Sequence, residues 1–248
     1  MLTDDELERY DRQIAITGFG KEGQEKLKKA KAFLAGAGGL GCTISLYLAA
    51  AGVGTIRMVD PQTIELSNLN RQVLHWTEDI GRMKVDSATE KLRRLNPDVK
   101  VEAIGQKITA ANISELTAGF DLLVDAMDNL PTRYLLNKIA LEKNIPFFHG
   151  AVYGFEGRVM TILPGQTACL KCLYRGDIPE EKIPVVGVTP AIIGCIQAAE
   201  VIKYIVGIGQ LLTNKLLIYD GLTMKFTELK VKKKPDCEHC GRLVKDEK

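Results

Sequence analysis

"KAFLAGAGGLG", residues 31–41, joins an apolar run to a cluster of glycines. The apolar run is typical of a buried strand, and the stretch at 40–52, apolar all round, is typical of a helix packed on a sheet. A strand that passes through glycines into a helix is how a Rossmann-type fold begins. The backbone N–H groups of such a turn, here including those of Gly38 and Gly39, can face phosphate together with the helix dipole.

Strands and helices continue to alternate after this start. We expect strands at 55–60, within 120–128 and at 145–150, and helices within 82–97 and at 130–143. Such alternation implies a parallel sheet with helices on both faces. After residue 150, "GRVMTIL", "KLLIYD" and "MKFTELKVK" are hairpin-prone and flank one apolar helix at 190–206. The sequence therefore predicts an α/β, Rossmann-like fold, with a mainly parallel sheet and added antiparallel strands in the C-terminal third.

Length, composition and charge narrow the classes of protein. With 248 residues and 46% hydrophobic composition, we expect a single domain over 1–248, with a helical arm at 1–30, a nucleotide-binding core at 31–150 and a β-rich part at 151–248. The net charge of +2 provides no electrostatic footprint for nucleic acid or a membrane. The stretch "MLTDDELERY" lacks the apolar core of a signal peptide, and Gln197, Glu200 and Lys203 interrupt the late apolar stretch. We expect a cytoplasmic protein.

Asp60 ends the second strand, ~20 residues after the glycines, where an acid usually binds a ribose. NAD and ATP both fit this pattern, because each has a ribose and phosphates. Tyr134 and Lys138 have a Tyr-x-x-x-Lys spacing that some dehydrogenases use, but the spacing is common by chance and its neighbours are apolar. We interpret the pair as structural. We also interpret three scattered histidines as satisfied polar groups: His75, His149 and His239.

Charged and polar side chains gather near the same sheet edge. Residues 67–72 supply a run of donors, Lys84 follows, and "DAMDN" brings Asp125, Asp128 and Asn129 to the end of a strand. Arg71 and Lys84 can neutralise a polyphosphate and Asp128 can hold magnesium, which is what phosphoryl or nucleotidyl transfer needs.

Each of these residues also has an ordinary structural interpretation. Arg71 fits a surface arginine, and Lys84 fits a solvated lysine at a helix start. Asp128 or Asn129 fits the N-cap of the helix that contains Pro131. Their joint occurrence favours a site.

Six motifs then occur in order: "RYDRQ" at 9–13, "GAGGLGC" at 36–42, "LSNLNRQ" at 66–72, "GRMKVDSA" at 81–88, "DAMDN" at 125–129, and the paired "CLKC" and "CEHC". Over nearly the whole chain they resemble the MoeB/ThiF/HesA family, the bacterial and archaeal branch of the ubiquitin-activating enzyme superfamily. The resemblance implies ATP-dependent adenylation of the C-terminal Gly-Gly carboxylate of a small ubiquitin-fold sulfur-carrier protein. The products would be an acyl-adenylate and pyrophosphate, and residues 151–248 would bind the carrier.

The same resemblance implies roles for single residues. Asp60 would bind the ribose and Asp128 the magnesium, with Asn129 beside it, and the phosphates would contact Ser67, Asn68, Arg71 and Lys84. Arg12, in "RYDRQ", would reach the triphosphate from the neighbouring subunit of a homodimer. A terminal carboxylate is already ionised at neutral pH, so its attack on the α-phosphorus needs no general base.

Two C-x-x-C pairs predict a metal site. Each pair offers two thiolates to one tetrahedral zinc, which we expect to be structural: Cys169, Cys172, Cys237 and Cys240. Disulfides or chance are the alternative, and His239 is a less favoured substitute ligand. Closing the site would tie the C-terminal tail to the loop after residue 168.

The remaining cysteines bear on where the reaction stops. Superfamily members that form an enzyme thioester or persulfide link have a cysteine in the loop after the first C-x-x-C pair, but residues 173–190, "LYRGDIPEEKIPVVGVTP", contain none. We expect Cys42 and Cys195, both in apolar helical contexts, to be core residues. The product is then an acyl-adenylate that passes to a separate sulfur donor.

Other functions remain open at this point. An NAD-dependent oxidoreductase would use the glycine loop and Asp60, a zinc scaffold would bind a ubiquitin-fold partner without turnover, and a dehydratase of the same superfamily would modify tRNA. The carrier itself could serve molybdopterin, thiamine, tRNA thiolation or protein conjugation.

Overall fold

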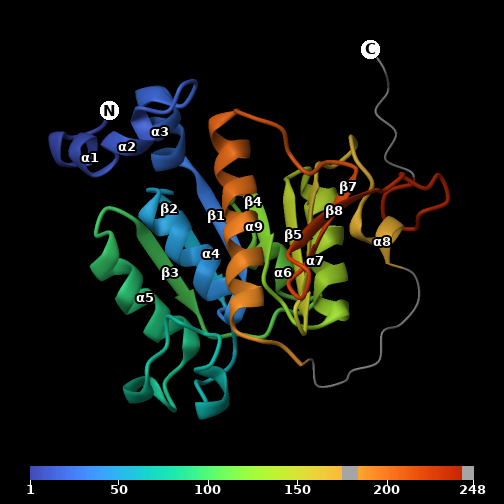
Figure 1. The fold of residues 1–248 in the computed structure, drawn as a ribbon, viewed down its shortest axis with the longest axis horizontal. Coiled ribbons are helices and arrows are strands. Elements are labelled where there is room, and N and C mark those ends of the chain that lie inside the picture. The colour runs from blue at the N-terminus through green and yellow to red at the C-terminus, as the bar shows by residue number, and fades with distance from the viewer. Residues whose placement is uncertain (175–183, 242–248) are drawn as a thin grey trace.

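The computed structural model describes residues 1–174 and 184–241. Its strands form one sheet, in the order β3-β2-β1-β4-β5-β6-β7-β8 (Figure 1). The strands are β1 (Lys31–Ala35), β2 (Thr55–Val59), β3 (Lys100–Ile104), β4 (Leu122–Asp125), β5 (Phe147–Tyr153), β6 (Glu156–Ile162), β7 (Lys215–Asp220) and β8 (Lys225–Lys230). Pairing is parallel from β3 to β5 and antiparallel from β5 to β8. The predicted mixed sheet is confirmed.

Helices cover both faces of the sheet. The helices are α1 (Asp4–Arg9), α2 (Asp11–Ile14), α3 (Gly20–Lys29), α4 (Gly39–Ala50), α5 (Lys84–Leu95), α6 (Ile113–Leu116), α7 (Leu130–Lys143), α8 (Leu170–Leu173) and α9 (Val188–Val206), with 3-10 turns η1 (Leu66–Asn68) and η2 (Thr77–Asp79). One core contains residues of α4, α5 and α9, and the other contains residues of α6, α7 and α8. Successive side chains of a strand point to opposite faces, so Leu34 joins the first core and Phe33 the second. This is why β1 is apolar throughout.

Two parts of the fold differ from the sequence reading. The N-terminal arm is three helices and not one, because Tyr10 leaves helical geometry and Gly18 and Gly20 have positive φ. Strand β3 was not foreseen. It is an edge strand in which only Val101 is fully buried, so its sequence lacks the apolar run of the central strands.

Helix α9 is the one helix in the described ranges that is long and apolar enough to cross a membrane. It lies against β5, β6 and α4. Its buried Gln197 donates to the carbonyl of Asp125, and its buried Glu200 accepts from the hydroxyl of Thr161. These contacts make α9 a core helix, and its apolar composition reflects packing against the sheet.

Candidate active site and metal centre

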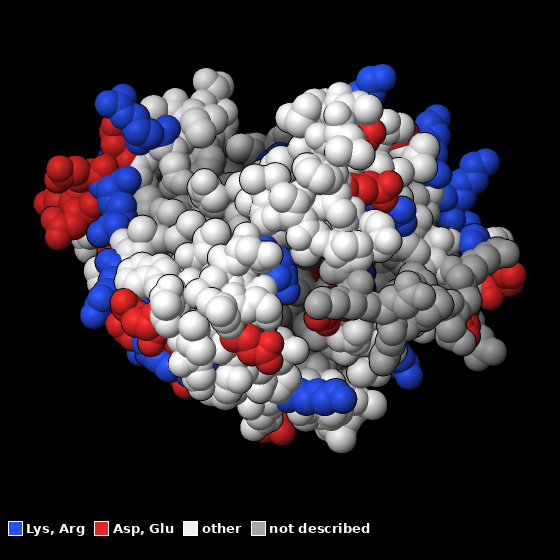
Figure 2. All heavy atoms as spheres, turned by 60° about the horizontal axis from the view of Figure 1, so that its bottom comes forward, with Lys and Arg blue, Asp and Glu red and all other residues white. Residues whose placement is uncertain are grey.

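The residues predicted to hold a nucleotide come together at the carboxyl ends of three strands. The glycine loop follows β1, Asp60 follows β2 and Asp128 follows β4, and β2, β1 and β4 are neighbours in the sheet. Open α/β sheets bind ligands at this edge. It lies at the bottom of Figure 1, and Figure 2, which turns that side forward, shows a hollow near the middle with cationic and acidic side chains in it.

The glycine loop requires its glycines. Gly36 has a φ of 102°, and a Cβ at this residue would lie 2.6 Å from the carbonyl oxygen of Ala126. Gly38 is the N-cap of α4, and its N–H has no hydrogen-bond partner within 1–174 and 184–241. An unpaired N–H at the positive end of a helix dipole favours an anionic ligand.

Asp60 braces this loop. One carboxylate oxygen accepts a hydrogen bond of 2.8 Å from the N–H of Ala37, and the other accepts one of 2.9 Å from the N–H of Gln62. A carboxylate has further lone pairs, so these bonds leave capacity for a ribose hydroxyl. The brace was not foreseen, and the ribose contact stays a prediction.

Lys84 is buried at the start of α5, with 3% of its surface exposed. Its ammonium donates to the side-chain oxygen of Gln62 at 2.7 Å, and the ion pairs of the described residues include none to Lys84. The interpretation as a solvated lysine is therefore wrong. A buried cation whose described partner is a neutral amide is well suited to an anionic ligand.

The polar run at 66–72 is held by contacts within itself. Asn68 accepts from the N–H of Glu65 at 3.1 Å, and the exposed Ser67 contacts the Glu65 carboxylate. The half-buried guanidinium of Arg71 donates to the Ser67 carbonyl and to the side chain of Asn70, each at 2.9 Å. Arg71 is thus an ordered residue, and its contact with phosphate stays a prediction.

Gln72 belongs to the same run but was not selected as a site residue. It is buried, and a Cβ built on Gly38 would lie 3.7 Å from its side-chain nitrogen. Its side-chain oxygen has no hydrogen-bond partner in the described ranges. Buried polar atoms are nearly always paired, so this oxygen indicates a place for a ligand or water beside the loop.

Asp128 and Asn129 separate into two roles. The Asn129 side chain accepts from the N–H of Thr132 at 3.0 Å, which confirms that Asn129 is the N-cap of α7. Asp128 is exposed and contacts only the Asn129 amide, at 3.3 Å, among the side-chain contacts described. Its carboxylate is therefore accessible at the sheet edge.

Arg12 does not join this site in its own chain. Its side chain is 99% exposed, with one distant ion pair, 3.7 Å, to Asp11. Its neighbours in the motif are anchored, since the Tyr10 hydroxyl accepts from Asn96 and Gln13 donates to Gln24. The anchored residues on either side of Arg12 thus hold it with its side chain exposed to solvent.

The four predicted metal ligands form one cluster. Their sulfur atoms all lie within 4.8 Å of one another, with Cys169 to Cys237 at 3.6 Å and Cys172 to Cys240 at 3.5 Å. Zinc–sulfur bonds of ~2.3 Å in a tetrahedron require sulfur atoms ~3.8 Å apart, so the residues fit a zinc ion. All four are free thiols, which argues against the disulfide alternative.

Asn137 of α7 connects both halves of the cysteine cluster. Its side chain is buried, accepts from the N–H of Leu170 at 2.9 Å and contacts His239 Nδ1 at 2.8 Å. The group of ligand atoms found together in the described residues consists of the four cysteine sulfurs without His239, so four cysteines are the better ligand set. Tyr134, on the same helix, packs edge-on against His239, as expected for a structural residue.

The two other cysteines differ from each other. Burial raises the pKa of the Cys42 thiol to about 12, which suits the predicted core residue. Cys195 is exposed, so its prediction as a core residue is wrong. The polar Gln197 and Glu200 of α9 are on its buried side, so composition could not tell the sheet-facing side of this helix from its outer side.

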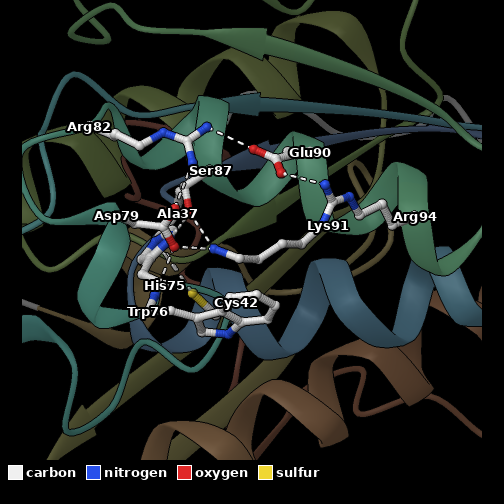
Figure 3. A network of polar contacts seen from close by, with 10 residues as sticks. All are labelled: Ala37, Cys42, His75, Trp76, Asp79, Arg82, Ser87, Glu90, Lys91 and Arg94. Atoms are coloured by element: carbon white, nitrogen blue, oxygen red, sulfur yellow. Dashed lines mark hydrogen bonds and ion pairs between the residues drawn. The ribbon is translucent and has the colours of Figure 1, made fainter.

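A polar network that the sequence did not reveal lies behind the glycine loop (Figure 3). His75 contacts the Ala37 carbonyl at 3.0 Å and the Ser87 hydroxyl at 3.1 Å, and Lys91 donates to the same hydroxyl at 2.9 Å. Lys91 is also ion-paired with the buried Asp79. Burial opposes the charge of Asp79, but the hydrogen bond and charge of Lys91 together with the hydrogen bond from the Trp76 N–H outweigh it and lower the pKa to about 2.

His149 is also satisfied inside the protein. It is fully buried, and its Nδ1 lies 2.6 Å from the carboxylate of Asp125. Its Nε2 lies 3.3 Å from the hydroxyl of Tyr174. The interpretation of the three histidines as satisfied polar groups is confirmed.

The family model described as "ThiF family" matches residues 10–239. The chain belongs to the ThiF family. The SAMP-activating enzyme E1 of Haloferax volcanii is 43% identical to it, covering 95% of this chain and 89% of that protein. The sulfur carrier protein adenylyltransferase of Thermus thermophilus is also 43% identical, covering 96% and 92%.

A solved relative supports the fold of this ThiF-family chain. A crystal structure of E. coli MccB with MccA-N7isoASN matches with a TM-score of 0.86 and 26% identity, covering 94% of this chain and 75% of that one. The match extends over both the parallel part and the added antiparallel strands, since it covers nearly all of the chain. Fold and family therefore agree.

Proposed function

We propose that this ThiF-family chain is an adenylyltransferase that uses ATP to activate the C-terminal Gly-Gly carboxylate of a small ubiquitin-fold sulfur-carrier protein. The observation that carries the proposal is the buried, carboxylate-free Lys84 beside the loop braced by Asp60. An anionic substrate of high charge suits such a site. Relatives over nearly the full chain are named adenylyltransferases or E1 activating enzymes.

In the proposed reaction, a carboxylate oxygen of the carrier forms a bond to the α-phosphorus of ATP. The bond from that phosphorus to the bridging oxygen breaks, and the electron pair leaves with pyrophosphate. Lys84 and Arg71 meet the charge that develops on the leaving group, while Asp60 holds the ribose in line. The attacking group is already ionised, so no histidine is required as a base.

The cofactors have separate places in this scheme. Asp128, with Asn129 beside it, would hold magnesium, which neutralises phosphate charge. Gly38, Gly39, Ser67 and Asn68 would contact phosphates. The cluster of Cys169, Cys172, Cys237 and Cys240 would hold a structural zinc.

We assign the carrier to the β-rich part, residues 151–248, while 31–150 bind the nucleotide and 1–30 form the arm. The β5–β6 and β7–β8 hairpins, turns included, leave large apolar side chains exposed: Tyr153, Phe155, Leu222, Met224, Phe226 and Leu229. Exposed apolar groups in one region mark a protein-binding surface. We place the enzyme in the cytoplasm, where its thiols stay reduced.

The test is exchange of label between pyrophosphate and ATP in the presence of magnesium and a carrier. Exchange should depend on the carrier, and a carrier lacking its last two glycines should not support it. Stabilisation of the chain by magnesium-ATP and not by NAD separates this function from an oxidoreductase. Binding of the carrier without exchange would instead indicate a non-catalytic scaffold. Pyrophosphate exchange that depends on a tRNA nucleoside would indicate a dehydratase.

We further propose a homodimer in which Arg12 completes the partner's site, because its exposed guanidinium has no other strong contact in the described ranges. Arg12→Ala and Asp128→Ala proteins should each be inactive. In a mixture, each heterodimer has one intact site, so activity should return to about a quarter of the wild-type value if subunits assort at random. A monomeric mass in solution with full activity would rule out this arrangement.

A thioester on the enzyme is not expected. Residues 175–183 of the loop after the first C-x-x-C pair lie outside the described residues, but 173–190 contain no cysteine. Burial raises the pKa of Cys42 to about 12, and the pKa of the exposed Cys195 is also raised by partial burial. Both thiols therefore stay protonated and poorly nucleophilic near neutral pH.

After incubation with magnesium-ATP and carrier, denaturing gels with and without thiol reductant should look the same. An adduct that reductant removes, and that disappears in Cys195→Ala, would show that α9 carries a nucleophile. The acyl-adenylate would otherwise pass to a separate sulfur donor.

A further inference from the structure

The peptide group between Ala37 and Gly38 presents its carbonyl oxygen and its N–H to opposite sides. Its carbonyl oxygen, from Ala37, points to the protein interior and accepts from His75 Nε2 at 3.0 Å. A trans peptide is planar, so the N–H of Gly38 at its other side points in the opposite direction. That N–H has no partner within the described ranges. Whatever holds the Ala37 carbonyl therefore also directs the Gly38 N–H.

The hydrogen bonds around His75 have one consistent direction. A carbonyl oxygen only accepts, so Nε2 must carry the ring proton. Burial lowers the pKa of His75. The nearby cations Lys84 and Lys91 also lower it, whereas the carboxylate of Asp79 raises it. The ring is therefore neutral, and because Nε2 carries the one ring proton, Nδ1 has none. Nδ1 then accepts from the Ser87 hydroxyl, whose oxygen accepts from Lys91.

The far end of this chain is anchored. Lys91 has only donors to offer, and it is held by the ion pair with Asp79 and by the ring of Trp76, 4.3 Å from its ammonium. Figure 3 shows Lys91 reaching from α5 toward Ser87 and Asp79, with His75 and Ala37 beside them. Lys91 can only donate and the Ala37 carbonyl can only accept. The histidine between them therefore fits this chain of hydrogen bonds in one tautomer, with the proton on Nε2.

We propose that His75 is a positioning residue of the nucleotide site, which aims the Gly38 N–H at the phosphates by holding the Ala37 carbonyl. This inference rests on the proposed function for the identity of the ligand. Asp60 holds the N–H of Ala37 from the other side, at 2.8 Å, so both peptide groups of Ala37 are fixed. His75 touches no substrate in this scheme and acts only through the loop.

The first test compares two substitutions of His75. His75→Leu removes the imidazole donor to Ala37 and leaves only the weak thiol donor of Cys42, 3.5 Å from the same oxygen, while His75→Gln has an N–H donor near the position of Nε2. The affinity for magnesium-ATP should fall about tenfold or more in His75→Leu and return to within about threefold in His75→Gln, because the loop contact acts in the ground state and the transition state alike. The KM for ATP should rise accordingly with little change in kcat.

Thr117→Val is the matched control. Thr117 is also fully buried, and its hydroxyl donates to a backbone carbonyl, that of Ile113 in α6, a helix that supplies no residue to the proposed site. This variant should lose stability and keep its ATP affinity. Equal weakening of ATP binding in Thr117→Val, or wild-type binding by a folded His75→Leu, would overturn the positioning role.

Nitrogen NMR of His75 gives a readout that does not depend on activity. The neutral Nε2–H tautomer is expected, and an Nδ1–H tautomer would contradict the proposal. ATP affinity is measured without carrier, so it can support or reject His75 even if pyrophosphate exchange fails. Failure of exchange in a wild-type protein that binds ATP would count against the proposed function alone.

Discussion

Replacing Lys84 with Ala should slow carrier-dependent pyrophosphate exchange by ~100-fold or more, because it removes a cation from a dry site where charge develops. Lys84 is buried and its described side-chain partner is the neutral Gln62, so the variant loses one of the proposed phosphate cations from an enclosed position. Lys84→Gln keeps a polar group of similar length and should lose nearly as much. That result would assign the effect to charge and not to packing.

The same loss is expected for Asp128→Asn and Arg71→Ala. Asp128 is exposed and makes only one side-chain contact in the described ranges, so its replacement should leave stability unchanged while exchange falls. Lys138→Ala is the control for loss of a surface charge, since Lys138 is exposed and pairs with Glu142 on α7. Near-normal exchange in all three site variants would show that the site is misplaced.

Loss of a cysteine ligand should have the largest effect on stability. The protein should contain about one zinc per chain, and metal binding to preorganised thiolates contributes directly to folding. Cys240→Ser should lower the melting temperature by about 10 °C or more, at roughly 2–4 °C per kcal/mol for a domain of this size. The cluster joins the segment at 169–172 to the chain's last described residues, so the tail should become susceptible to proteolysis.

Cys195→Ser is the matched control for this experiment. Cys195 is exposed and lies outside the cluster, so zinc content and melting temperature should stay unchanged. Elemental analysis separates ligand loss from simple destabilisation, because only the cluster variants should lose metal. Cleanly prepared wild-type protein without zinc would refute the assignment.

Much of the fold could be predicted because its signals are local. The glycines at 36–41 require a close approach of backbone to backbone, and Gly36 indeed has a positive φ and no room for a Cβ. Central strands such as β1 are buried on both faces and therefore appear as apolar runs. The spacing of two cysteines by two residues is set by metal geometry, so the pairs could be recognised without knowing where the chain brings them together.

Tertiary structure alone decided the rest, because those features depend on groups far apart in the sequence. His75 becomes a partner of Ala37 only when the segment between η1 and η2 meets the glycine loop, and Lys84 becomes buried only when the segment at 60–62 covers it. Cys195 is exposed because α9 turns that side away from the sheet. Sequence patterns report the period of an element and the geometry of a short motif, whereas burial and hydrogen-bond partners are set by which surfaces pack together.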